Sequence, residues 1–121
     1  MHRVFVYGTL RRGESHAQLM QGARFLGSHI TEPRYTLCDM SEYPTAVSWG
    51  ATAIHGEVYE VDDALLRRLD EYEEFPEVYN RRLIHTPYGG AWIYLMLAPP
   101  AVACVIAHGD WCRRDQVELE E

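Results

Sequence analysis

Features that would indicate a membrane protein or a nucleic-acid-binding protein are missing from this sequence. The first apolar run, VFVYGTL at residues 4–10, is far too short to span a bilayer and lacks the architecture of a signal peptide. No phosphate-binding loop is present, because neither GxxxxGK followed by Ser or Thr nor GxGxxG occurs. Basic residues are few, at 11 against 18 acidic ones, for a net charge of −7. Nucleic-acid binding needs a basic patch, so we expect neither a nucleic acid nor a membrane as partner.

Cysteine and histidine are present but form no recognisable motif. Cys38, Cys104 and Cys112 are an odd number without a CxxC pair, so we expect reduced thiols in a cytoplasmic protein. The six histidines show no HExxH, no HxH and no cluster with cysteine. We therefore expect no metal and no cofactor. A nucleophile elbow and a Cys-centred catalytic signature are also missing.

Hydrophobic residues, in contrast, are plentiful. They make up 47% of the 121 residues, which fits a globular protein and excludes a disordered one. No repeat, linker or low-complexity tract divides the chain, so residues 1–121 are expected to form a single domain with an irregular tail from about residue 112. We expect a monomer.

Short strand patterns separated by turn residues predict an α+β fold. Residues 3–8 are apolar on both faces and indicate a central strand. The other strand candidates are residues 23–31, 34–39, the end of 42–50, 53–61, the hairpin 78–97 and the less regular 102–111. Short helices are expected at residues 15–22, from a capping box of Ser15 and Gln18, and at 65–75. We predict a small mixed, mostly antiparallel β-barrel or curled sheet with two short flanking helices.

The helix LLRRLDEYEEF at residues 65–75 carries an unusual number of acidic residues. At about 100° per residue, its apolar side chains form one stripe, which defines the buried face. The stripe consists of Leu65, Leu66, Leu69 and Tyr72. Glu73 lies about 40° from Leu69, inside this stripe, whereas Glu71 and Glu74 lie on the far side. A carboxylate there is costly unless it is paired or hydrogen-bonded.

Two ordinary explanations for Glu73 remain open on the helix alone. The helix can end before residue 73, because Pro76 follows closely. Alternatively, Glu73 forms a structural ion pair with Arg81 or Arg82. The third explanation is a functional carboxylate.

The end of the first strand, YGTL at residues 7–10, is the second candidate site. A buried strand that ends in Gly8-Thr9 presents backbone N–H groups at a sheet edge, and glycine allows a ligand to approach closely. Such N–H groups suit a carboxylate or a developing oxyanion. An ordinary turn between a strand and a loop would show the same four residues.

Taken together, several motifs resemble the gamma-glutamylcyclotransferase-like family, in its small stand-alone bacterial form. The matching residues are YGTLR at 7–11, GEVY at 56–59, LDEYE at 69–73, Tyr79, Arg81 and AWIY at 91–94. Their order covers roughly residues 4–97. Singly these motifs are weak, and together they are fairly specific.

The resemblance implies an α+β fold around a small β-barrel, and a small γ-glutamyl molecule as substrate. It implies that Tyr7, Gly8, Thr9 and Leu10 hold the glutamyl end and that Glu73 is the general acid/base. The reaction would be cyclisation of a γ-glutamyl amide to 5-oxoproline with release of an amine, where the substrate supplies its own nucleophile. Tyr79 would line the cavity or hydrogen-bond Glu73, and Tyr94 is a weaker candidate because strand aromatics are usually core.

The sequence leaves several alternatives open. The same cavity would serve a non-catalytic binding module for a γ-glutamyl or amino-acid derivative, or an enzyme that hydrolyses or transfers the glutamyl group. The leaving amine is undetermined. Arg81 would bind a substrate carboxylate or pair with the acidic run, and the roles of Arg11 and Arg12 are similarly open.

Overall fold

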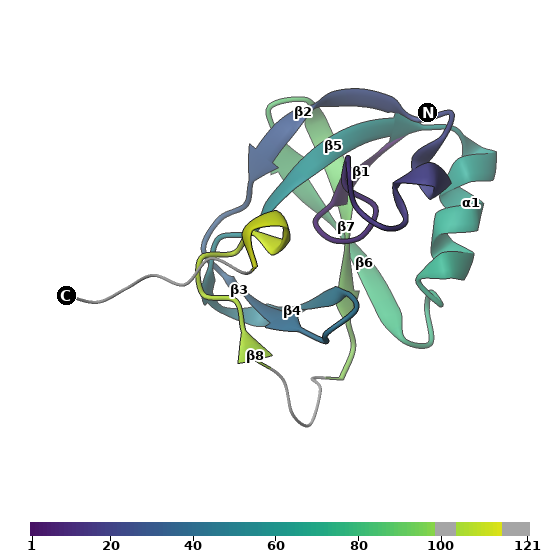
Figure 1. Ribbon diagram of the computed structural model, residues 1–121. Coiled ribbons are helices and arrows are strands. Elements are labelled where there is room, and N and C mark those ends of the chain that lie inside the picture. Colours follow the sequence, from purple (N-terminus) through teal and green to yellow (C-terminus); the bar gives the residue numbers. More distant parts are fainter. Residues whose placement is uncertain (99–103, 115–121) are drawn as a thin grey trace.

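Two β-sheets and one α-helix form the described structure (Figure 1). The computed structural model describes residues 1–98 and 104–114. The strands are β1 (His2–Val6), β2 (Arg24–Ile30), β3 (Tyr35–Asp39), β4 (Pro44–Thr52), β5 (His55–Val61), β6 (Tyr79–Thr86), β7 (Gly89–Met96) and β8 (Cys104–Val105). The helices are α1 (Asp63–Tyr72) and two short 3-10 helices, η1 (Ala17–Met20) and η2 (Trp111–Arg113).

The larger sheet has the strand order β2-β5-β1-β7-β6, and the smaller one β4-β3-β8. All neighbours pair antiparallel except β1 and β7, which are parallel. The predicted α+β fold with a mostly antiparallel sheet is therefore confirmed. The larger sheet is curled but not a closed barrel, because within the described residues β2 and β6 each have one strand neighbour only.

Of the two predicted flanking helices, only the second forms an α-helix, α1. Residues 15–22 contain only the 3-10 helix η1, and no side chain caps it. The Ser15 hydroxyl lies 3.1 Å from Nδ1 of its neighbour His16 instead of forming the expected capping box. The short length fits a 3-10 helix, whose strained hydrogen bonds rarely extend beyond four residues.

Strand boundaries differ from the predictions in the middle and at the end of the chain. Residues 42–50, expected as a loop leading into a short strand, belong largely to the nine-residue strand β4. The candidate strand 102–111 is described as the two-residue β8, which pairs with β3, and the helix η2 begins at its end. Residues 99–103 and 115–121, including most of the expected irregular tail, lie outside the described residues.

The core lies on both faces of β1, as the sequence predicted for a central strand. Val4 and Val6 pack with the leucines of α1 on one face. Phe5 and Tyr7 point to the other face, toward the smaller sheet. Because successive strand side chains alternate between faces, β1 joins the two halves of the core, and its end lies between them.

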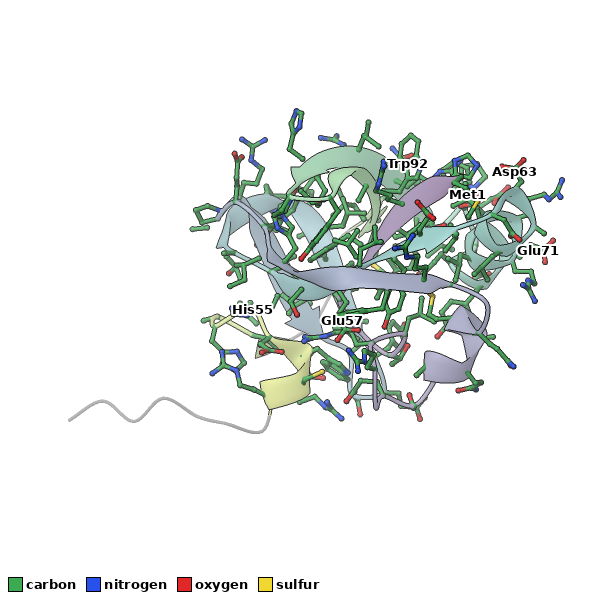
Figure 2. The ribbon with its side chains drawn as sticks, turned by 90° about the horizontal axis from the view of Figure 1, so that it is seen from above. Met1, His55, Glu57, Asp63, Glu71 and Trp92 are labelled. Atoms are coloured by element: carbon green, nitrogen blue, oxygen red, sulfur yellow. The ribbon has the colours of Figure 1, made fainter. Side chains whose placement is uncertain are left out.

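Helix α1 covers one face of the large sheet (Figure 1). Asp62 caps its start by accepting a hydrogen bond of 2.7 Å from the backbone N–H of Leu65. The predicted leucine stripe is buried, and Glu71 lies on the outer side of the helix (Figure 2). Tyr72, the fourth predicted member, is instead 39% exposed. The helix ends at this residue, and the side chain turns toward the end of β1 rather than into the leucine core.

Candidate active site

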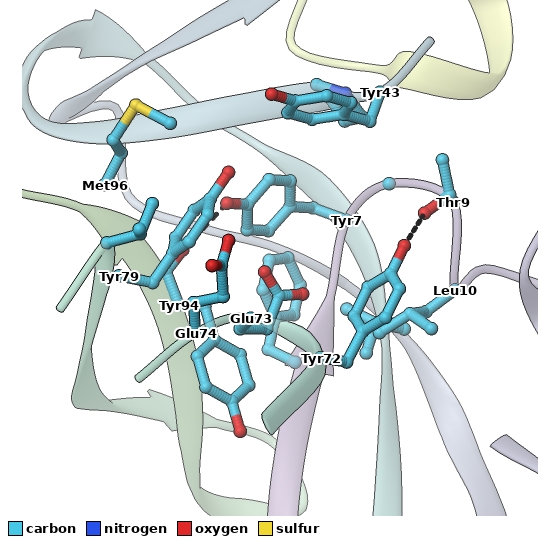
Figure 3. Close-up of a pocket in the computed structure, with 15 residues that line it drawn as sticks. Tyr7, Thr9, Leu10, Tyr43, Tyr72, Glu73, Glu74, Tyr79, Tyr94 and Met96 are labelled. Carbon is cyan, nitrogen blue, oxygen red and sulfur yellow. Dashed lines mark hydrogen bonds between the residues drawn. The ribbon is translucent and has the colours of Figure 1, made fainter. Parts of the chain in front are cut away.

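A cavity of about 280 Å³ opens where the end of β1, the end of α1 and the start of β4 meet (Figure 3). Its wall contains residues 5–10, the pair Tyr43 and Pro44, residues 72–74, and side chains from the facing ends of β6 and β7. Helix α1 contributes its last turn because Glu73 is the C-cap residue and Glu74 adopts a left-handed backbone with φ 52°. This turn directs both carboxylates to the cavity.

Residues 7–10, which we call the cavity loop, are all buried. Gly8 is required by packing, since a Cβ atom at this position would lie 2.6 Å from Cγ of Pro44. Among the hydrogen bonds of the described residues, none uses the backbone N–H of Gly8, Thr9 or Leu10 as donor. Buried N–H groups without a partner are rare in native proteins, so this loop is suited to bind ligand oxygens.

Tyrosine dominates the cavity wall. Five of the eight tyrosines of the chain line it: Tyr7, Tyr43, Tyr72, Tyr79 and Tyr94. Several of their hydroxyl groups are tied to the surrounding structure. Tyr7 donates a 2.7 Å hydrogen bond to the carbonyl of Tyr94, and the hydroxyl groups of Tyr79 and Thr45 lie 2.8 Å apart. Burial raises the pKa of Tyr7 and of Tyr79, so both are neutral at physiological pH.

Glu73 differs from these tyrosines because its carboxylate has no hydrogen-bond or ion-pair partner among the described residues. It is half-buried and lies with Glu74 between Tyr72 on one side and Tyr79 on the other (Figure 3). Burial raises its pKa to about 7, because the ionised form is poorly solvated there. Glu73 can therefore hold or release a proton near neutral pH.

The expected ion pair between Glu73 and Arg81 is not formed, because Arg81 binds Asp70 instead. Its Nη1 lies 3.1 and 3.0 Å from the two carboxylate oxygens of Asp70, and the guanidinium lies over the Phe75 and Trp92 rings. Tyr94 donates a further 2.7 Å hydrogen bond to Asp70. Arg81 thus pairs with Asp70, a member of the acidic run, and does not line the cavity.

The residues that the sequence singled out lie together in this structure. Tyr7, Gly8, Thr9, Leu10, Glu73 and Tyr79 all line the one cavity. Sequence reasoning missed Tyr43, Glu74 and Met96, which line it as well. Glu74 had been placed on the far face of an ideal helix, but its left-handed backbone rotates it back. No sequence motif indicated Tyr43 as a cavity residue, because it lies in a turn outside the recognised motifs.

Neither a metal site nor a membrane-spanning helix is found in residues 1–98 and 104–114. No group of three or more His, Cys, Asp or Glu side chains there is arranged to hold a metal ion. No described helix has both the length and the apolar composition needed to cross a bilayer.

Comparisons with known proteins give a consistent result. The family model for gamma-glutamyl cyclotransferase, AIG2-like, matches residues 4–113. A Vibrio cholerae protein, named provisionally as a gamma-glutamylcyclotransferase, is 46% identical over 113 residues, 93% of this chain and 97% of its own. The gamma-glutamylcyclotransferase family protein YtfP of Escherichia coli is 40% identical over 94% of this chain and 99% of its own. Its solution structure superimposes with a TM-score of 0.74, at 41% identity and the same coverage.

A bovine protein named gamma-glutamylaminecyclotransferase is 40% identical over 97 residues, which are 72% of this chain and 57% of the bovine one. The match of the family model and the identity to full-length relatives place the whole cavity inside the shared region. The chain belongs to the gamma-glutamylcyclotransferase family.

Proposed function

We propose that this protein cyclises a γ-glutamyl amide to 5-oxoproline and releases an amine, with Glu73 as general acid/base. One observation carries the proposal: the unpaired carboxyl of Glu73, whose pKa is raised to about 7, shares a cavity with a loop of free backbone N–H groups. A proton-transfer group and an oxygen-binding loop are the two elements that this reaction needs.

The substrate supplies the nucleophile in this reaction. Its α-amine nitrogen attacks the side-chain amide carbonyl, a C–N bond forms to close the five-membered lactam, and the original amide C–N bond breaks. Pre-orientation of such a tethered nucleophile is worth effective molarities of about 10⁵–10⁸ M. In agreement with this, the cavity wall contains no Cys, Ser or His among the described residues.

Glu73 would handle the two protons that the α-nitrogen loses in turn, the first before attack and the second as the lactam N–H forms. An α-ammonium with a pKa near 8 must lose its proton before it attacks, which is uphill by about 5 kcal/mol to a glutamate of ordinary pKa. With a pKa of about 7, the transfer to Glu73 is uphill by only about 1–2 kcal/mol. Glu73 gives the first proton to the departing nitrogen, then takes the second from the lactam nitrogen and passes it to the released amine, so that the enzyme returns to its starting state.

The cavity loop would bind the glutamyl part of the substrate. The N–H groups of Gly8, Thr9 and Leu10 would donate to its carboxylate or to the oxyanion that forms during attack. The aromatic wall would fold the glutamyl chain into its attacking conformer, with Tyr7 and Tyr79 held rigidly by their own hydrogen bonds. Five tyrosines in one wall favour a compact, partly apolar ligand.

The charged residues of the cavity wall also indicate which leaving amines fit. It contains two carboxylates and, among the described residues, no arginine, and the chain has no lysine at all. A leaving group that is neutral or cationic therefore fits better than one rich in carboxylates. The name of the bovine relative, which specifies γ-glutamylamines, points in the same direction.

The test is a panel of γ-glutamyl amides whose leaving amines differ in charge, with 5-oxoproline detected by mass spectrometry. The wild type, Glu73→Gln and Glu71→Gln are compared, since Glu71 is a matched carboxylate on the outer side of the same helix. We expect product from wild type and Glu71→Gln, and a loss of about 10²–10⁴-fold in rate for Glu73→Gln.

Each other product pattern would contradict the proposal in a different way. Glutamate in place of 5-oxoproline would identify a hydrolase. Tight binding without any product would identify a binding module that uses the same cavity. An equal rate for Glu73→Gln and wild type would remove Glu73 from its assigned role.

A further inference from the structure

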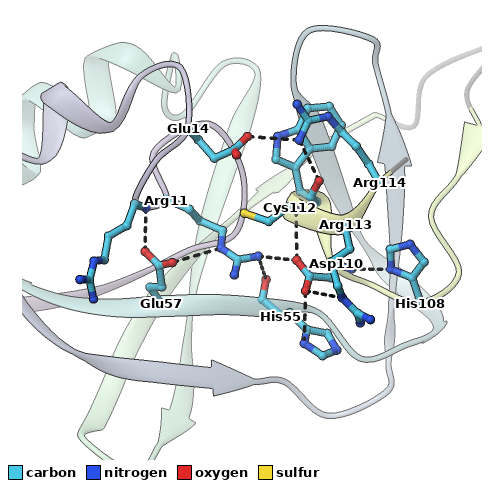
Figure 4. A network of polar contacts seen from close by, with 11 residues as sticks. Arg11, Glu14, His55, Glu57, His108, Asp110, Cys112, Arg113 and Arg114 are labelled. Atoms are coloured by element: carbon cyan, nitrogen blue, oxygen red, sulfur yellow. Dashed lines mark hydrogen bonds and ion pairs between the residues drawn. The ribbon is translucent and has the colours of Figure 1, made fainter. Parts of the chain in front are cut away.

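Arg11, the residue directly after the cavity loop, is the centre of an ion cluster (Figure 4), and its members do not line the cavity. Its Nη1 donates a 2.8 Å hydrogen bond to Asp110, which precedes η2. Its Nε lies 3.4 Å from Glu57 of β5, and Nη1 also lies 3.4 Å from the carbonyl of His55. One guanidinium thus links the loop to two segments that are distant in the sequence.

Glu57 holds the same part of the chain through a second route. It accepts a 3.0 Å hydrogen bond from the backbone N–H of Arg12 and another of 3.0 Å from the hydroxyl of Tyr59. The chain that follows the cavity loop is therefore fixed through a side chain and through the backbone at neighbouring residues. Two backbone hydrogen bonds complete the turn, from Arg11 to Gly8 and from His16 to Thr9.

The cluster is largely buried, so its charges must be paired in good geometry. The side chains of Arg11, Glu57 and Asp110 are 13%, 9% and 11% exposed. Burial alone would raise the pKa of Asp110, but hydrogen bonds from Arg113 and Arg11 outweigh burial and hold this pKa below its ordinary value. Buried charges are tolerated only when they are paired in good geometry, so the cluster permits few other arrangements of the loop.

Nothing in the proposed reaction uses these charges directly. Arg11, Glu57 and Asp110 are not in the cavity wall, and no described cavity opens on the cluster. They connect to the cavity through the loop, whose N–H groups at Gly8, Thr9 and Leu10 have no hydrogen-bond acceptor among the described residues. The orientation of those N–H groups therefore depends on how the next residues, Arg11 and Arg12, are held by Asp110 and Glu57.

We propose that Arg11 is a positioning residue, which, with Glu57 and Asp110, orients the free N–H groups of the cavity loop for a ligand carboxylate or oxyanion. The proposal assigns to this cluster a role in glutamyl binding, and that part of it rests on the proposed function. A misplacement of about 1 Å in such a loop can cost on the order of 10²-fold in rate.

The test replaces Arg11 with Met, which keeps much of the aliphatic packing, and with Lys, which restores one charge but not the forked geometry. Arg113→Met is the matched control. Arg113 also donates to Asp110, at 2.9 Å, but its side chain is 47% exposed and forms no hydrogen bond or ion pair with the described residues of the loop. Asp110→Asn provides a second way to weaken the cluster if Arg11→Met does not fold.

The first readout is amide hydrogen exchange by NMR at residue 11 and at His16, whose N–H groups bond to the cavity loop. We expect exchange at least about tenfold faster in Arg11→Met, partial recovery in Arg11→Lys, and no change in Arg113→Met. Equal exchange in Arg11→Met and wild type would overturn the proposal, as would an equal effect of Arg113→Met.

The second readout is KM and kcat for whichever γ-glutamyl amide the wild type converts best. Arg11→Met should lower kcat/KM by about 10- to 100-fold, and Arg11→Lys should restore part of this, while the acid limb of the pH profile set by Glu73 stays in place. A shift of that limb would assign Arg11 to the proton chemistry and overturn a positioning role. If wild type converts no amide at all, the proposed function fails, and hydrogen exchange still decides whether Arg11 orders the loop.

Discussion

Glu57 and Glu73 are both withdrawn from water, yet their surroundings are opposite. Glu57 lies on a central strand and accepts hydrogen bonds from the side chain of Arg11, the backbone of Arg12 and the hydroxyl of Tyr59. Glu73 lies at the end of a helix, and its carboxylate has no such partner among the described residues. Glu73 lines the cavity together with the cavity loop, whereas Glu57 does not line it and binds the chain directly after that loop.

This difference separates a carboxylate that orders structure from one that is free to react. A charge satisfied by several donors stays ionised, and its removal leaves those donors without partners. A half-buried charge without donors prefers to be neutral, which raises its pKa toward the pH at which it works. The protein thus places two glutamates in opposite surroundings, one bonded to the chain after the cavity loop and one in the cavity wall.

The largest expected effect is on folding, from Glu57→Ala. Removal of this carboxylate leaves the N–H of Arg12 and the Tyr59 hydroxyl without their acceptor, and Arg11 retains only Asp110 and the carbonyl of His55, so we expect a loss of about 3–5 kcal/mol in the free energy of unfolding. Urea denaturation at pH 7 measures it, with Glu60→Ala on the same strand as control. A loss below about 1 kcal/mol would show that Glu57 is not a structural acceptor.

Glu73→Gln, in contrast, is expected to increase the free energy of unfolding at high pH. Because the pKa of Glu73 is raised from 4.5 to about 7 by folding, its stabilising contribution is complete below pH 4.5 and is lost as the pH rises through about 7. The Gln variant does not ionise, so it should be as stable as wild type at pH 4 and more stable by at most about 3 kcal/mol at pH 8. Urea midpoints across this pH range test it, and parallel curves would refute the raised pKa.

The pH dependence of catalysis should show a smaller effect of the same group. Glu73 must be ionised to accept the proton of the substrate, so kcat/KM should rise with pH through about 7. Between pH 8 and pH 6 we expect a decrease of about tenfold, equivalent to about 1.4 kcal/mol. Initial rates under subsaturating substrate measure this, and an acid limb near pH 4.5 would show that Glu73 titrates as in water.

The smallest effect is expected from Tyr72→Phe. Its hydroxyl lies 3.2 Å from Oγ1 of Thr9, a long hydrogen bond at a half-exposed position between the helix and the cavity loop. We expect an increase in KM that corresponds to no more than about 1 kcal/mol, with kcat nearly unchanged. A kcat loss as large as that of Glu73→Gln would mean that Tyr72 takes part in proton transfer.

Local pattern was sufficient for several parts of this fold. The alternation of apolar residues identified β1 as a strand buried on both faces, and the leucine spacing identified the inner face of α1. The alternative that the helix ends before residue 73 is confirmed, because Tyr72 is its last residue and Glu73 its C-cap. The same helical geometry was correct for the outward direction of Glu71, which lies inside the helix. It was wrong for Tyr72 and Glu74, since both lie where the helix ends and the ideal geometry no longer applies.

Such local patterns did not predict contacts between segments that are distant in the sequence. No local pattern assigned a definite partner to Arg11 or Arg81, because an arginine pairs with whichever acid the tertiary structure brings near. Residues 11, 57 and 110 meet only after β1, β5 and η2 are in place. The parallel pairing of β1 with β7 likewise depends on the whole chain rather than on a local turn signal.

By itself, then, the sequence determined the periodicities of its strands and helix and the glycine within the cavity loop. The tertiary structure decided which carboxylates have partners. Burial, hydrogen bonding and charge all depend on neighbours that lie dozens of residues away, and these three factors set both the pKa of Glu73 and the stability of the cluster around Arg11.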